Sequence, residues 1–127
     1  MLENQGAFAS YSVDDTDKAK GFYRGVLGLD VQEGKEPGIL ELKIKHGPAV
    51  ILYPKENHEP ATFTVLNLIV PSVDRAVDEL GRQGVKFEIY RDGPVRTDER
   101  GIMRGNGPTI AWFKDPAGNI ISVVEVG

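Results

Sequence analysis

A pattern that occurs twice constrains the fold of this chain more than any other feature. Residues 16–26 carry apolar side chains at i, i+3, i+4 and i+7, and the segment that follows Pro71 and Ser72 repeats this spacing. Such a stripe is typical of a helix that packs against a sheet through one face. The two stripes are Ala19, Phe22, Tyr23 and Val26, and then Val73, Ala76, Val77 and Leu80.

Strands are predicted around both helices, where β-branched and aromatic residues are bounded by turn residues. Within residues 39–45, positions 40–45 alternate strictly between apolar and charged, which indicates an antiparallel strand with one buried face. Asp14 or Asp15 can cap the first helix, and Gly28 and Gly84 can end the two helices. The predicted strands are residues 7–13, 29–32, 39–45, 49–53, 62–70, 85–90, 110–113 and 120–126.

The element order is therefore β-α-β-β-β, a linker, and β-α-β-β-β again. We expect a single domain over residues 1–127, with module one at about 7–54, a proline-bracketed linker at 54–61 and module two at about 62–126. One helix covers only one face of a four-stranded sheet. The opposite face of the sheet must therefore curl around itself, around another sheet or around a ligand.

Composition excludes several classes of function. The net charge is −4 and no Lys/Arg run occurs, so nucleic acid is not an expected partner. No apolar run approaches the roughly 18 residues that a membrane span needs, and no basic-then-apolar leader is visible. The absence of cysteine excludes disulfides and thiolate sites. These features favour a cytoplasmic protein.

The motifs resemble those of the vicinal oxygen chelate superfamily, which includes glyoxalase I, bleomycin-resistance proteins and extradiol dioxygenases. The closing Phe-Lys-Asp-Pro-Ala-Gly-Asn segment, residues 113–119, is similar to its C-terminal hairpin, and Phe22-Tyr23 followed by Leu27-Gly28 is similar to its first module. The resemblance implies an α+β fold of two tandem βαβββ modules. These would form a curved, barrel-like mixed sheet with the helices outside, the glyoxalase/bleomycin resistance fold.

Many members of that superfamily hold a divalent metal, which polarises a bound oxygen, with a His, Gln or Glu from the first and last strand of each module. Matching the motifs places these four positions at Phe8, Leu52, Val65 and Ser122. These side chains cannot form an ordinary Mn, Zn, Ni or Fe site. Glu125, three positions from Ser122, is expected to point away from the cavity. No cofactor is predicted, and a divalent metal is the alternative.

The two histidines lie outside the predicted cavity strands. His46 is in a Gly-Pro turn and His58 is in the linker, so both are expected to be solvated or turn residues. No Ser-His-Asp or Cys-His arrangement is visible. The loop at 91–108 is expected to be a lid, a dimer contact or disordered, and its role stays open.

The residues expected to line a cavity combine apolar walls with a few hydrogen-bonding groups. Such a lining suits a small, partly aromatic or amphipathic molecule. Alternatively, Phe8, Leu52 and Val65 pack together and fill the space. The candidates are Phe8, Ser10, Ser12, Val50, Leu52, Val65, Asn67, Met103, Trp112 and Ser122.

The resemblance to bleomycin-resistance-type members implies non-covalent binding of a small organic ligand by a homodimer. Open sheet edges also favour dimerisation, because unpaired strands need covering. Two alternatives remain. One is a metal-dependent lyase, isomerase or dioxygenase of the same superfamily, and the other is a non-catalytic dimer with a filled cavity.

Overall fold

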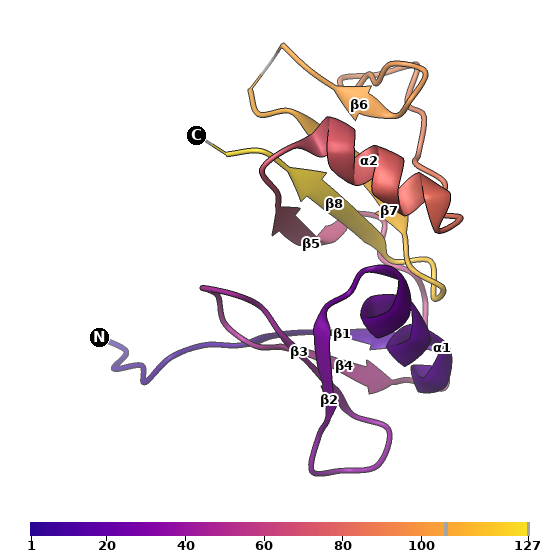
Figure 1. The fold of residues 1–127 in the computed structure, drawn as a ribbon. Coiled ribbons are helices and arrows are strands. Elements are labelled where there is room, and N and C mark those ends of the chain that lie inside the picture. Colours follow the sequence, from indigo (N-terminus) through magenta and orange to yellow (C-terminus); the bar gives the residue numbers. More distant parts are fainter. Residues whose placement is uncertain (106, 127) are drawn as a thin grey trace. The chain divides into compact units, whose positions relative to one another are not determined.

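The computed structural model of the chain describes residues 1–105 and 107–126. These residues fold into two compact units, which divide between Glu59 and Pro60. The boundary between the units falls inside the linker that the sequence predicts at residues 54–61. Each unit has its own helix and its own four-stranded mixed sheet (Figure 1).

The first unit has the strand order β1-β4-β3-β2. β1 and β4 are parallel, and the other two pairs are antiparallel. The predicted helix at 16–26 forms, but it changes from α to π geometry at Gly21. The elements are β1 (Ala9–Val13), α1 (Thr16–Lys20), η1 (Gly21–Val26), β2 (Asp30–Glu33), β3 (Leu40–Lys43) and β4 (Val50–Pro54).

The first core lies between the helical segment and one face of this sheet. Asp15 caps α1, since its carboxylate accepts a hydrogen bond from the Lys18 N–H at 3.1 Å. Ala19 and Tyr23 of the predicted stripe are buried. The buried Tyr11 hydroxyl of β1 donates to the Tyr23 hydroxyl at 2.8 Å, which marks the face of β1 that the helix covers.

The second unit has the strand order β5-β8-β7-β6, and α2 packs on β7 and β8 (Figure 1). Ser72 caps α2 by accepting from the Arg75 N–H at 3.2 Å. Buried apolar side chains of α2, β7 and β8 form the core, among them Val77, Phe113 and Ile121. The elements are β5 (Thr64–Ile69), α2 (Val73–Arg82), β6 (Ile102–Met103), β7 (Ile110–Lys114) and β8 (Ile120–Val124).

The prediction of a continuous strand at 85–90 is wrong. That segment makes only an isolated antiparallel bridge, from Phe87 to Phe113. The remaining edge of β7 pairs with β6, which comes from the predicted loop at 91–108. Ile102 takes the edge position because its side chain, 1% exposed, fills the core beside Ala111. Two segments therefore share one strand edge.

The predicted β7–β8 hairpin is present, and its turn is held by buried polar side chains. The Asp115 carboxylate accepts from the Asn119 N–H at 2.8 Å and from its side-chain amide at 3.3 Å. The Asn119 side-chain oxygen accepts from the Ala61 N–H at 3.2 Å, so the turn also fixes the start of the second unit. Gly118 has φ +85°, a conformation that glycine adopts at little cost.

The predicted fold class is confirmed: both units have the order βαβββ, with a mixed sheet and a helix on one face. Most strand ends agree within two residues; residues 39–45, for example, become Leu40–Lys43. Among the residues that the structure describes, no helix is both long and apolar enough to cross a membrane.

Candidate ligand-binding faces

We use the term helix-free face for the side of each sheet opposite its helix. In the first unit, β1 alternates as predicted. Tyr11 and Val13 are buried toward the helix, whereas Ser10 and Ser12 point to the helix-free face. Phe8, which precedes β1 with the same parity, is 69% exposed. The predicted grouping of Phe8, Ser10 and Ser12 agrees with this alternation.

The predicted placement of Val50 and Leu52 on that same face is wrong. In the parallel pairing of β1 with β4, Ser10 lies opposite Ile51 and Tyr11 lies opposite Leu52. Paired residues point to the same side of a sheet, so Leu52 lies on the helix side and is 0% exposed. Val50 is buried there as well. Ile51 and Tyr53 occupy the helix-free face instead.

His58, expected to be a solvated or turn residue, follows a turn and contacts this face. Its Nδ1 atom is hydrogen-bonded to the Ser12 hydroxyl at 2.7 Å, and its side chain is half-buried. A turn bond from the His58 N–H to the Lys55 carbonyl, 3.0 Å, places the histidine there. His46 is exposed at φ +60°, as expected for a turn residue.

In the second unit, the sheet brings four of the predicted candidates to one face. Asn67 of β5 is paired with Ser122 of β8, and Ser122 is paired with Trp112 of β7. The Ser122 hydroxyl, in a side chain 0% exposed, donates to the Asn67 side-chain oxygen at 2.5 Å. Met103 pairs with Ile110, which shares the parity of Trp112. This is the helix-free face of the second sheet.

Trp112 is fixed in place by residues that the sequence did not single out. Its indole N–H donates to the Thr64 hydroxyl at 3.1 Å. The Tyr90 ring packs edge-on against it, with centroids 5.6 Å apart and an interplanar angle of 70°. Burial raises the pKa of Tyr90, with a smaller contribution from the Glu88 carboxylate, so the phenol stays neutral at physiological pH. Lys114 forms an ion pair with Glu88 at 3.5 Å.

Val65 lies at an irregularity in β5. The pairing of β5 with β8 shifts by one residue between Thr64 and Leu66, so Val65 is the extra residue of a β-bulge. From Leu66 onward the register is regular, which places Asn67 opposite Ser122. The bulge therefore allows both Thr64 and Asn67 to face the same side as Trp112.

The residues at the four positions that the resemblance matches to metal ligands do not fit a metal. Phe8 and Val65 offer no donor atom, Leu52 is in the core, and the Ser122 hydroxyl is already bonded to Asn67. Ile51 and Tyr53 lie on the helix-free face instead of Leu52, and the only possible metal-binding group in their side chains is the Tyr53 phenol. Within the described residues no group of three or more His, Cys, Asp and Glu is placed to hold an ion.

Glu125 was expected to point away from the cavity, and it does turn toward the helix side. Its carboxylate accepts from the Val73 N–H at 2.7 Å, at the N-terminus of α2. Negative charge is favourable there because the first N–H groups of a helix have no partner within the helix. Glu125 therefore has a structural role.

Two hollows in the described residues are lined by other side chains. One, of about 420 Å³, lies in the first unit between the start of α1 and the β2–β3 turn, beside the Lys20–Glu33 ion pair. The other, of about 750 Å³, lies beside Val70, Thr109 and Glu125 in the second unit. None of the ten predicted candidates lines either hollow.

Comparison with known proteins identifies the family. The family model described as the Glyoxalase/Bleomycin resistance protein/Dioxygenase superfamily matches residues 7–123. The chain therefore belongs to this superfamily, as its motifs predict. A search of curated proteins found no match.

Several solved structures are similar over nearly the whole chain. TnmS3, an antibiotic binding protein from Streptomyces sp. CB03234, has 24% identity and a TM-score of 0.74, covering 100% of this chain and 99% of its own. A glyoxalase/bleomycin resistance protein from the same Streptomyces has 27% identity and a TM-score of 0.67, with 95% and 100% covered. An integron cassette protein from the V. cholerae mobile metagenome has 28% identity and a TM-score of 0.64, with 100% and 98% covered.

Proposed function

We propose that this protein binds a small, partly aromatic organic molecule non-covalently and without a metal ion. The observation that carries the proposal is the hydrogen bond from Ser122 to Asn67 at 2.5 Å. At the position that the resemblance matches to a metal ligand, this chain has a hydroxyl that is already bonded to an amide.

The helix-free face of the second sheet has the chemistry for such a ligand. Trp112, Tyr90 and Met103 offer aromatic and polarisable surface, and the Asn67 amide and Tyr90 hydroxyl offer polar contacts. Mostly apolar and aromatic side chains with a few placed polar groups are the lining typical of sites for small organic molecules. The similarity to a structure named as an antibiotic binding protein supports this class of ligand.

Replacing Asn67 by Ala tests the proposed face with an aromatic probe. We expect the affinity for 1-anilinonaphthalene-8-sulfonate to fall about fivefold, because one hydrogen-bonding group contributes on the order of 1 kcal/mol. Titration followed by the fluorescence of the probe measures this effect. Asn57→Ala, an exposed change in the linker, is the matched control and should leave the affinity unchanged. Equal affinities for both variants and the native chain would contradict the proposed face.

A further inference from the structure

The segment 97–104 is fixed at several points. At its start, the Thr97 N–H donates to the Tyr90 carbonyl at 2.8 Å, and the Thr97 hydroxyl accepts from the Tyr90 N–H at 2.9 Å. At its end, Met103 pairs with Ile110 on the helix-free face. The segment therefore connects directly to two residues of the proposed binding face. We refer to residues 97–104 as the strap.

The middle of the strap turns tightly and approaches the backbone of its neighbour. The Asp98 carboxylate accepts from the N–H groups of Arg100 and Ile102, both at 2.9 Å. Gly101 has φ +84°, and a Cβ atom there would lie 2.8 Å from the Phe87 Cβ and 2.9 Å from the Glu88 carbonyl oxygen. The strap thus lies directly against the segment that carries Tyr90.

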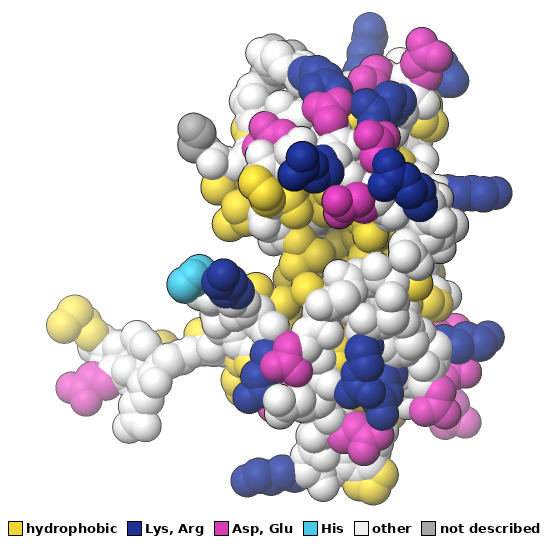
Figure 2. Space-filling view, in the orientation of Figure 1, with side chains coloured by type: hydrophobic (Ala, Val, Ile, Leu, Met, Phe, Trp, Pro, Cys, Tyr) yellow, Lys and Arg dark blue, Asp and Glu magenta, His cyan; other side chains and the backbone are white. Residues whose placement is uncertain are grey.

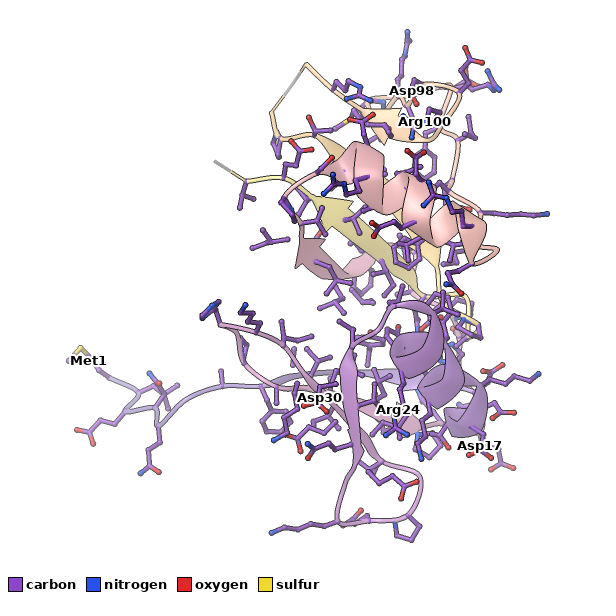
Figure 3. The ribbon with its side chains drawn as sticks, viewed as in Figure 1. Met1, Asp17, Arg24, Asp30, Asp98 and Arg100 are labelled. Atoms are coloured by element: carbon purple, nitrogen blue, oxygen red, sulfur yellow. The ribbon has the colours of Figure 1, made fainter. Side chains whose placement is uncertain are left out.

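Two arginines of the strap clamp one carboxylate on α2. Arg100 donates to Asp74 at 2.9 Å and to Asp78 at 2.5 Å. Arg104 donates to both oxygens of Asp74, at 2.9 and 2.7 Å. Figure 3 shows Arg100 and Asp98 in the loop region beside α2. Basic and acidic side chains are also interspersed over this part of the surface in Figure 2.

The protonation state of Asp74 agrees with the clamp. The Arg104 hydrogen bond is the largest factor that lowers the pKa of Asp74 from its ordinary value of 3.8 to about 2, and Arg100 adds to it. A carboxylate with a lowered pKa stabilises the folded arrangement above its ordinary pKa, and the effect is lost as the pH falls toward 2. The other charged groups around the clamp are Asp78, Asp98 and Glu125.

We infer that Asp74 is a positioning residue: through Arg100 and Arg104 it closes the strap, which holds Tyr90 and Met103 on the binding face. This inference rests on the proposed function for its link to a ligand. The closed strap is the arrangement that binds, and an open strap withdraws Met103 and releases the Tyr90 backbone. Since the side chains of the clamp are 42–56% exposed, ionic strength screens it.

Hydrogen exchange of the full chain, without any ligand, tests the strap. In Asp74→Asn we expect exchange across residues 97–104 to be about fivefold faster, the size expected from a few half-exposed ion pairs. Asp74→Glu keeps the charge and should restore slow exchange. Glu33→Gln, which removes the exposed Lys20 ion pair in the other unit, is the matched control. Unchanged exchange in Asp74→Asn would overturn the inference.

Two further readouts separate positioning from general stability. Trp112 is the only tryptophan, so its emission reports on the Tyr90 contact, and we expect a red shift in Asp74→Asn that Asp74→Glu does not show. Saturating 1-anilinonaphthalene-8-sulfonate should slow exchange of the strap in the native chain. Suppose that exchange of the strap becomes faster in Asp74→Asn but the probe does not slow exchange of the strap in the native chain. The link between the strap and ligand binding is then wrong, whereas the role of Asp74 in closing the strap is supported. If the emission stays native while the strap opens, the positioning of Tyr90 is wrong.

Discussion

Replacing Leu52 by Ala is expected to lower the free energy of unfolding by about 3 kcal/mol, within the range for a buried leucine whose site only partly collapses. Leu52 is 0% exposed and lies between Tyr11 of β1 and Leu40 of β3 in the sheet. Urea denaturation followed by far-UV circular dichroism measures the change. This substitution tests the register that separates the core of the first unit from the helix-free face of its sheet.

The neighbouring residue provides the matched control. Tyr53 is 36% exposed on the helix-free face, so Tyr53→Ala should cost less than about 1 kcal/mol. If instead Leu52→Ala were nearly neutral and Tyr53→Ala strongly destabilising, the assignment of the two faces of β4 would be reversed. Leu52 would then lie on the helix-free face of the first sheet.

Replacing Asn119 by Ala is the second change with a large expected effect, a loss of about 3 kcal/mol. Asn119 is 2% exposed, and its side chain joins the Asp115 carboxylate to the Ala61 N–H. The substitution removes both bonds in a buried turn, where lost hydrogen bonds carry the full cost of desolvation. Thermal unfolding in parallel with urea denaturation measures it.

The Asn57→Ala variant again serves as control, because Asn57 is exposed. Asn119→Asp separates hydrogen bonding from shape. It keeps the oxygen that faces Ala61 but places a second carboxylate beside Asp115, so it should also destabilise the chain. A native-like midpoint for Asn119→Ala would show that the turn does not depend on this side chain.

The faces of β1 could be predicted from the sequence, and those of β4 could not. In β1, Ser10 and Ser12 alternate with Tyr11 and Val13, so polarity marks the two sides. Residues 50–53, Val-Ile-Leu-Tyr, are apolar at every position, and alternation then gives no preference. A shift of one residue moves the whole strand to the other face, which is the error made for Val50 and Leu52.

Long-range contacts account for the other residues that the sequence did not reveal. His58 meets Ser12 across 46 positions, and Thr64 meets Trp112 across 48, so no local period indicates either contact. The position of Tyr90 could have been inferred from the sequence. In the predicted strand at 85–90, Tyr90 lies on the face opposite Phe87 and Ile89. Ile102 pairs with part of the β7 edge that the predicted strand at 85–90 was expected to occupy. Both Ile102 and Phe87 offer an apolar side chain to the same core.

The most direct test of metal-free binding is one titration of 1-anilinonaphthalene-8-sulfonate into metal-stripped protein and into protein supplied with Mn, Ni, Zn or Fe. We expect saturable binding with the same dissociation constant in every case, because Phe8, Val65 and the paired Ser122 offer no metal site. Binding that appears only after one of these metals is added would contradict it.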